Sequence, residues 1–233
     1  MRKKDEWYYE HANFFEVLNH EQQHRLVGLS KAVHFKKGQL MCGIGDLCEH
    51  TYIVRRGIIK VFLLSPDGKE TILAIRQPGN IISVTPIFGW PRRVSYVAAL
   101  SEVDVLKIRV EDIRNMILSD IRLAEFIIKM LCARLHHSRR LIHDLSTKDV
   151  RDRLISLLLD LLKECGVEKD GDIVINIELT HEQLSQMIAT SRQSVTTILN
   201  DLESQGMIQS IQKRISVREP DSLVRLLEGG DSL

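Results

Sequence analysis

The apolar positions between residues 179 and 217 follow a helical period twice and then change to a β-type pattern. Thr180 can cap the first helix with Gln183 in a capping box, and Ser191 can cap the second, which ends near Gly206. The positions expected to be buried are Leu184, Met187 and Ile188, then Val195, Ile198, Leu199 and Leu202. This pattern predicts a helix-turn-helix followed by a β-hairpin wing.

The polar side of the second predicted helix carries side chains that can hydrogen-bond base edges. These are Arg192, Gln193, Thr196 and Thr197, all near the start of the helix. The N-terminal part of a recognition helix is the part that enters the major groove of DNA. A structural helical hairpin with solvated polar residues is the alternative that this stretch alone leaves open.

Residues 32–109 change to short β-type runs, separated by turn sequences such as Pro66-Asp67-Gly68 and Pro78-Gly79-Asn80. Many short strands with regular turns indicate an antiparallel sandwich or barrel. Residues 1–31 are predicted to be helical and to cover this β-domain.

One long helix is predicted from residue 110 to residue 145. Apolar and small residues recur along it at alternating steps of four and three, a seam that two such helices can share. The seam consists of Ala124, Ile128, Leu131, Leu135, Ser138, Ile142 and Leu145. This face could instead pack on the β-domain, but Ile127, Met130 and Leu141 offer further apolar surface for that contact, so a homodimer is expected.

The polar run 146–149 interrupts the seam and predicts a hinge at Asp149. Residues 150–164 then form a strongly apolar helix, and residues 167–179 turn at Asp170-Gly171 into strand character. A small second domain is therefore expected from residue 149 onward.

Composition and charge add little to these expectations. The 233 residues carry a net charge of +1, so any contact with nucleic acid must come from a local basic patch. No N-terminal apolar run resembles a signal peptide or membrane span, which predicts a cytoplasmic protein with reduced thiols. Cys42 and Cys48 are expected to be buried and inert, with a redox switch as the alternative. No catalytic set and no metal site is recognisable, and no enzyme activity is expected.

The order of these parts resembles the catabolite activator/anaerobic regulator (CRP/FNR) superfamily of bacterial transcription factors. The resemblance is carried by HFKKGQLM at 34–41, LSTKDVRDRL at 145–154 and TSRQSVTTILNDLESQGMI at 190–208. It implies an α+β fold in which a cyclic-nucleotide-binding-like β-roll, or jelly roll, precedes a long dimerisation helix and a winged helix-turn-helix. The corresponding domains are an effector-sensing β-roll with an N-terminal helix at 1–109, a dimerisation helix and hinge at 110–148, and a DNA-binding domain at 149–233.

The resemblance also implies DNA contacts. The family's base-reading positions fall on Arg192, Gln193 and Thr197, with Thr196 nearby, and the retained Arg192 suggests a TGT-type half-site in an inverted repeat. Phosphate contacts are expected from Thr180, Ser191, Lys213 and Arg214. RNA polymerase is an expected partner if the protein is an activator. Ala189 replaces a glycine common in the family turn, so this turn is expected to differ slightly.

The effector implied by the resemblance is not cyclic AMP, because Val84 stands where cyclic-AMP-binding members carry glutamate. Residues 133–158 resemble nitrogen regulators that sense 2-oxoglutarate, and Arg93 and Arg134 match arginines that such members use on an anionic ligand. Arg139 departs from that pattern, since the family carries an acidic residue there. The candidate pocket for a small anionic effector comprises Val84, Arg93, Arg134, Ser138 and Arg139. Pairing of the arginines with local acidic residues is the alternative.

No resident cofactor is expected, since the cysteines do not match the iron–sulfur members and no Cys/His pair supports haem. The alternative function is a ligand-binding regulatory module that acts by protein contact without binding DNA. Arg192 and the basic pair Lys213-Arg214 argue against it.

Overall fold

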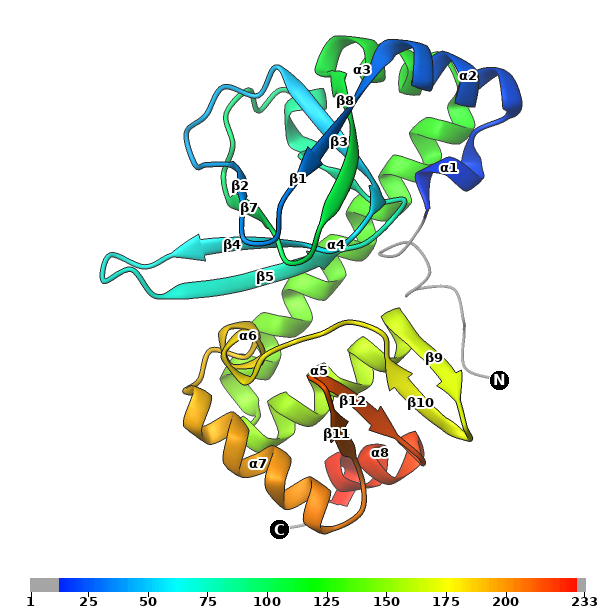
Figure 1. The fold of residues 1–233 in the computed structure, drawn as a ribbon. Helices are drawn as coiled ribbons and strands as arrows, with labels where there is room; N and C mark the ends of the chain where they lie inside the picture. The colour runs from blue at the N-terminus through cyan, green and yellow to red at the C-terminus, as the bar shows by residue number, and fades with distance from the viewer. Residues whose placement is uncertain (1–12, 230–233) are drawn as a thin grey trace. The chain divides into compact units, whose positions relative to one another are not determined.

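The computed structural model describes residues 13–229, which form two compact units that divide between Ser138 and Arg139. Each unit is described by itself, with the element labels of Figure 1. The domain boundaries expected from the sequence at 109/110 and 148/149 remain predictions.

The first unit contains two four-stranded antiparallel sheets, as the sequence predicted. One sheet has the order β1 (Ser30–Phe35), β8 (Val103–Arg109), β3 (His50–Arg56) and β6 (Ile81–Ile82). The other has the order β2 (Leu40–Cys42), β7 (Tyr96–Ala99), β4 (Ile59–Leu64) and β5 (Glu70–Arg76). Their shared core is apolar and includes Phe35, Val54, Ile59, Val97 and Val105. These strands form the predicted β-roll.

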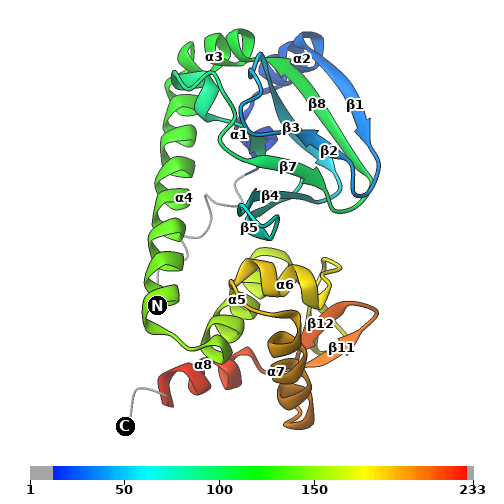
Figure 2. The same ribbon diagram turned by 90° about the vertical axis from the view of Figure 1, so that its left-hand side faces the viewer.

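The helices of the first unit gather around a second apolar core. They are α1 (Phe14–Val17), α2 (His20–Leu29), the 3-10 helix η1 (Thr85–Phe88), α3 (Val110–Leu118) and the start of α4 (Ile121–Thr147). Helices α2 and α3 cover one end of the sheets (Figure 2). The fully buried side chains of this second core include Phe14, Leu26, Ile113, Ile117, Leu123 and Ile127.

The helix predicted over residues 1–31 is wrong in its extent. Residues 1–12 lie outside the described residues, and the rest forms two helices with separate caps. Asn13 caps α1, and Asn19 caps α2 in a capping box with Gln22. Ser30 and Lys31 belong to β1, where they pair with Ile108 and Lys107.

The single helix predicted over 110–145 is likewise wrong, because it is broken at Ser119 and Asp120. The Ser119 amide still donates to Asn115, but its hydroxyl bonds back to the Met116 carbonyl at 2.9 Å. The Asp120 carboxylate accepts from the Arg122 amide at 2.9 Å and thereby starts α4. Local polar side chains therefore end one helix and begin the next.

The second unit combines the end of α4 and four further helices with a four-stranded antiparallel sheet of order β11-β12-β10-β9. Its elements are the end of α4, α5 (Val150–Cys165), β9 (Gly166–Lys169), β10 (Asp172–Ile175), α6 (His181–Met187), α7 (Arg192–Ser204), β11 (Gln209–Ile211), β12 (Arg214–Val217) and α8 (Pro220–Gly229). Helix α5 supplies most of the core, with Leu154, Ile155, Leu158 and Leu161 buried. The unit has the winged helix-turn-helix arrangement that the sequence predicted.

Candidate nucleic-acid interface

The helix-turn-helix begins at Thr180, which caps α6. The Gln183 amide donates to the Thr180 hydroxyl at 3.1 Å, and the Thr180 amide donates to the Gln183 side chain at 2.8 Å. This reciprocal pair confirms the predicted capping box. Leu184 and Ile188 are buried as expected, so α6 is fixed to the unit by its apolar face.

The turn between α6 and α7 passes through Ala189, whose φ of 53° lies in the left-handed region that favours glycine. The turn is closed by the Thr190 amide, which donates to the Ser185 carbonyl at 3.0 Å. Ser191 then caps α7 by accepting from the Ser194 amide at 3.0 Å, as predicted. These contacts determine where the first turn of α7 starts.

The N-terminal half of α7 presents the predicted base-reading residues. Arg192, Gln193 and Thr197 are exposed, while Val195 and Leu199 are buried on the opposite side. These three side chains are therefore free of the core and able to meet a groove.

Thr196 differs from its neighbours because it is half-buried and engaged. Its hydroxyl lies 2.8 Å from His181 Nδ1 and donates to the Arg192 carbonyl at 3.0 Å. His181 was not singled out from the sequence, although its place directly after the Thr180 cap puts it next to the helix that is predicted to read bases.

The wing is the hairpin β11–β12, whose tip is Gln212 and Lys213. Both tip residues have positive φ, 51° and 65°, as a two-residue turn of the hairpin type requires. Lys213 is exposed, and Arg214 is exposed with its guanidinium 3.9 Å from the Glu178 carboxylate. The Lys213 carbonyl accepts from the Leu179 amide at 3.1 Å, which holds the wing tip beside the chain leading to Thr180.

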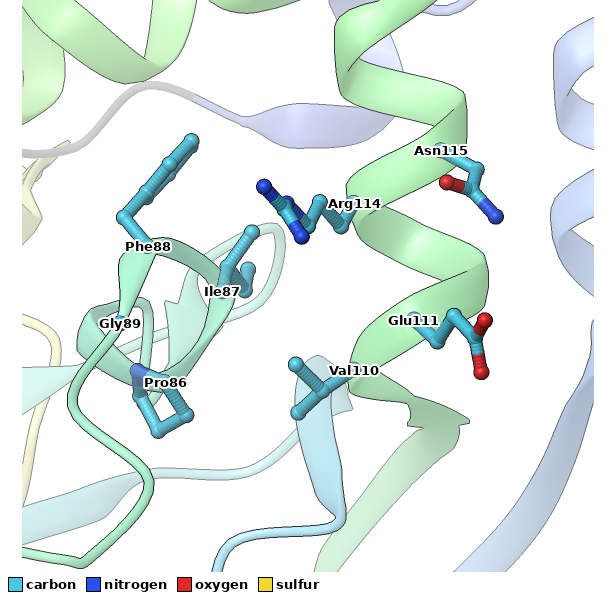
Figure 3. A pocket seen from close by; sticks show the side chains of 8 residues that line it. All are labelled: Pro86, Ile87, Phe88, Gly89, Val110, Glu111, Arg114 and Asn115. Carbon is cyan, nitrogen blue, oxygen red and sulfur yellow. The ribbon is translucent and has the colours of Figure 1, made fainter.

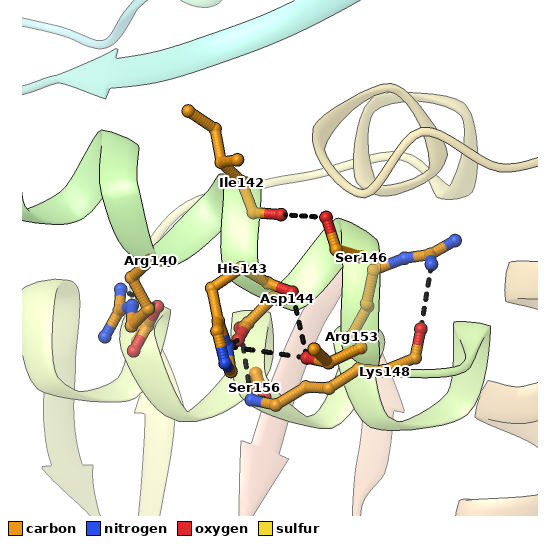
Figure 4. A network of polar contacts seen from close by, with 10 residues as sticks. Arg140, Ile142, His143, Asp144, Ser146, Lys148, Arg153 and Ser156 are labelled. Atoms are coloured by element: carbon orange, nitrogen blue, oxygen red, sulfur yellow. Dashed lines mark hydrogen bonds and ion pairs between the residues drawn. The ribbon is translucent and has the colours of Figure 1, made fainter.

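A polar network surrounds the junction of α4 and α5 (Figure 4). Lys148 donates to Asp144 at 3.1 Å and to the Ser156 hydroxyl at 2.9 Å, and Arg153 donates to the Lys148 carbonyl at 3.0 Å. The predicted hinge residue Asp149 caps α5 by accepting from the Asp152 amide at 2.8 Å. The last turn of α4 is thereby attached to α5.

The predicted effector residues of the first unit hold one segment of the β-roll. Arg93 is buried, donates to the Ser83 hydroxyl and, at 2.9 Å, to the His50 carbonyl, and lies over the Tyr52 ring. Arg134 of α4 donates to the Ile81 carbonyl at 3.1 Å. Residues 81–83 are therefore contacted by both guanidiniums, at Ser83 by Arg93 and at Ile81 by Arg134 of α4.

The other predicted effector positions are less connected to that segment. Val84 is buried directly before η1, whereas Ser138 and Arg139 are exposed on α4. The Ser138 hydroxyl donates back to the Arg134 carbonyl at 3.0 Å. The structure thus brings Arg93 and Arg134 to one segment without placing Ser138 and Arg139 there.

A pocket of about 580 Å³ lies elsewhere in the first unit, between η1 and α3 (Figure 3). Arg114 extends from α3 toward Ile87 and Phe88, whereas Glu111 and Asn115 point away from them. The lining residues are Pro86, Ile87, Phe88, Gly89, Val110, Glu111, Arg114 and Asn115. None of the predicted effector residues lines it.

The predicted seam of α4 is largely exposed. The exposed fractions are 61% for Ile128, 54% for Leu135 and 66% for Ile142, and Leu131 and Leu145 are also exposed. Ala124 is half-buried against the core of the first unit. In contrast, Ile127 and Met130 are buried, so one side of α4 packs on its own unit and the seam stays open.

The four cysteine thiols are free; Cys42 and Cys48 are buried, and Cys165 is partly buried. Burial raises the pKa of the Cys42 thiol to about 11 and that of Cys165 to about 12, and it also raises the pKa of Cys48. Only Cys132 is exposed among the four.

No helix within residues 13–229 is long and apolar enough to cross a bilayer. Across the same stretch, no three or more His, Cys, Asp and Glu side chains cluster as metal ligands would.

Comparison with known proteins agrees with this architecture. Residues 32–120 match the cyclic nucleotide-binding domain, and residues 152–226 match the Crp-like helix-turn-helix domain. The chain is 30% identical to the anaerobic regulatory protein of Bacillus subtilis, over 69% of this chain and 68% of the relative. It is 26% identical to the global nitrogen regulator of Synechococcus elongatus, over 81% and 86%.

A CooA mutant from Carboxydothermus hydrogenoformans has a similar fold, with a TM-score of 0.79 and 22% identity over 93% of this chain and 96% of that one. The cyclic nucleotide-binding domain thus precedes the Crp-like helix-turn-helix domain in this chain. The chain belongs to the CRP/FNR family of transcription regulators.

Proposed function

We propose that the protein is a homodimer that binds an inverted-repeat operator through α7, under the control of a small effector other than cyclic AMP. The observation that carries the DNA contact is the group Arg192, Gln193 and Thr197, exposed at the capped start of α7. Arg192 is suited to a bidentate contact with guanine O6 and N7, and Gln193 and Thr197 adjust the rest of the half-site.

Contacts with the DNA backbone are proposed for Thr180, Ser191, Lys213 and Arg214. Lys213 and Arg214 are exposed at the wing, and the Ser191 hydroxyl lies at the start of α7. Such contacts position the protein without reading sequence. They also release counterions, so operator affinity is expected to fall steeply with salt.

The open seam of α4 supports a homodimer. Ile128, Leu135 and Ile142 repeat at the seven-residue spacing of a shared helical seam and stay exposed in the single chain. Two recognition helices related by twofold symmetry would then meet two half-sites about one helical turn apart.

The effector is proposed to be a small organic anion bound near Arg93 and Arg134. Both guanidiniums lie at residues 81–83, and two guanidiniums can share a carboxylate. On binding, the anion would replace Ser83 as a partner of Arg93 and the Ile81 carbonyl as a partner of Arg134. Calorimetry with 2-oxoglutarate and related acids tests this proposal, and binding that is unchanged in Arg93→Ala would contradict it.

The operator proposal is tested by selecting fragments from random duplex DNA. We expect an inverted repeat with TGT-type half-sites. Arg192→Ala should weaken operator binding by about 1–3 kcal/mol and relax one base position, whereas Lys213→Ala should weaken all sequences alike. Asn200→Ala, also exposed on α7 but beyond its N-terminal half, is the matched control and should bind normally.

The alternative is a regulatory module that acts by protein contact without DNA. This alternative predicts that the selection enriches no DNA sequence and that Arg192→Ala does not change the fragments recovered. If the protein is an activator, RNA polymerase is the expected partner at the promoter.

A further inference from the structure

Three titratable side chains meet on the surface of the first unit, apart from the predicted DNA and effector residues. His34 lies on β1, opposite Asp104 of β8 in the strand register, and Glu102 directly precedes β8. The His34 Nδ1 atom lies 2.8 Å from Asp104 Oδ1, and its Nε2 atom lies 2.8 Å from Glu102 Oε2. Both nitrogens of one imidazole ring therefore contact carboxylates.

These partners determine how many protons the His34 ring carries. An ionised carboxylate can only accept a hydrogen bond, whereas a neutral imidazole has one N–H group and one nitrogen with a bare lone pair. A neutral ring would thus direct a lone pair at one of the two carboxylates across 2.8 Å. Only the imidazolium donates to both. Glu102 itself is held ionised, because a hydrogen bond from the Lys37 amide and a second one from His34 lower the pKa of its carboxyl.

Glu102 also connects the ring to the turn between β1 and β2. Its Oε2 atom contacts His34, and its Oε1 atom accepts from the Lys37 amide at 3.2 Å. The backbone of Glu102 is fixed from the other side, since its carbonyl lies so close to Gly57 that a Cβ there would collide with it. The carboxylate thus extends from a backbone packed against the turn between β3 and β4 and reaches residues 34 and 37.

We propose that His34, Glu102 and Asp104 form a pH-sensitive clasp, which holds the turn between β1 and β2 to β8 at neutral pH and loosens in alkaline solution. On loss of its proton the ring keeps a single N–H group, so its contact with one of the two carboxylates becomes repulsive. The proton passes to solvent, because all three side chains are exposed. The inference goes beyond the proposed function, since the clasp lies within the β-roll and requires neither DNA nor effector.

Further charged residues near the clasp are basic. Lys36 and Lys37 lie on the turn, and Arg56 of β3 is the register partner of Asp104. These cations favour the neutral ring, but the carboxylates touch it. The hydrogen bonds with Asp104 and then with Glu102 raise the pKa of His34 above the ordinary histidine value of about 6.5. The clasp therefore contributes fully below that value and is lost as the pH rises through the folded pKa.

The experiment is an NMR titration of the full-length protein from about pH 5.5 to about pH 9.5, with the protein in urea as the reference. We expect the His34 ring to titrate at a higher midpoint than in urea, and the Lys37 amide resonance to shift with the same midpoint. Glu102→Gln and Asp104→Asn should each lower that midpoint. Glu111→Gln removes an exposed carboxylate on α3 and should leave it unchanged.

Three outcomes would overturn the inference. The first is a His34 midpoint at or below its value in urea. The second is a raised midpoint that persists when Glu102→Gln and Asp104→Asn are combined. The third is a Lys37 amide whose resonance does not follow the ring, or still shifts with that midpoint in His34→Gln. The parent titration does not depend on any variant folding, and its failure leaves the proposed function intact because no duplex is used.

Discussion

Arg151 of α5 forms an ion pair with Asp201 of the recognition helix α7. Gln205 adds a second donor to the same carboxylate at 2.8 Å. The Arg151 hydrogen bond is the main reason that the pKa of Asp201 lies below its usual range. The pair connects the last turn of α7 to α5, the helix that supplies most of the core of its unit.

Replacement of Asp201 tests this connection through its pH dependence. A carboxyl with a depressed folded pKa contributes stability above the ordinary aspartate range, and that contribution is lost as the pH falls through the folded value. Asp201→Asn should therefore lower the melting temperature modestly at pH 7, with a smaller difference near pH 3. Thermal unfolding measures this, and Glu228→Gln, exposed on α8, is the control. A difference that is constant with pH would argue against the ion pair.

The left-handed backbone at Ala189 makes a prediction about stability. An L-residue in this conformation costs about 1 kcal/mol, which glycine avoids. Ala189→Gly should therefore raise the free energy of unfolding by up to about 1 kcal/mol. The matched change is Gly206→Ala, where φ is 69° and a Cβ would meet no atom within 4 Å. That substitution should lower stability by about the same amount, as measured by urea titration. Equal signs for the two changes would contradict the reasoning.

The seam of α4 predicts the oligomeric state. Ile128→Lys places a charge in the proposed dimer contact and should convert the dimer to a monomer while the fold is retained. His136→Lys is the control, because His136 is exposed on the same helix and does not fall on the four-and-three spacing of the seam. Analytical ultracentrifugation measures both. A parent protein that is monomeric, or an Ile128→Lys dimer of normal affinity, would remove the seam from the dimer contact.

Thiol chemistry tests the burial of the cysteines. A thiolate is the reactive form, and with pKa values of about 11 and 12 the Cys42 and Cys165 thiolates are scarce below pH 9. Iodoacetamide at pH 7.5 should therefore modify the exposed Cys132 first, with Cys42 and Cys165 reacting only on unfolding. Peptide mass spectrometry reports the order. Fast modification of Cys42 and Cys48 in the folded protein would revive the alternative that they form a redox switch.

Most of the second unit could be predicted from the sequence because its contacts are local. The Thr180 and Ser191 caps each join residues three positions apart, and the apolar faces of α6 and α7 repeat at helical spacing. Caps and apolar spacings of this kind can be recognised from the sequence alone. His181 was missed because its contact to Thr196 joins two helices across the turn.

The errors in the first unit have the same origin. The break between α3 and α4 lies inside a continuous amphipathic run, so periodicity alone predicts one helix. The break depends on Asp120, which also accepts from Gln22, 98 positions earlier in the chain, at 2.8 Å. The partners of Arg93 could not be predicted either, because Ser83 and His50 approach it only in the folded sheets.

The link between Gln22 and Asp120 also bears on how the β-roll can be isolated for study. Phe14 lies with its ring centre 5.8 Å from that of Phe126, and Leu26 is fully buried in the same cluster. A fragment that starts at β1 would lack both helices that cover this cluster and would leave Asp120 without Gln22. The shortest fragment of the first unit that can be expected to fold therefore starts no later than Asn13, the cap of α1.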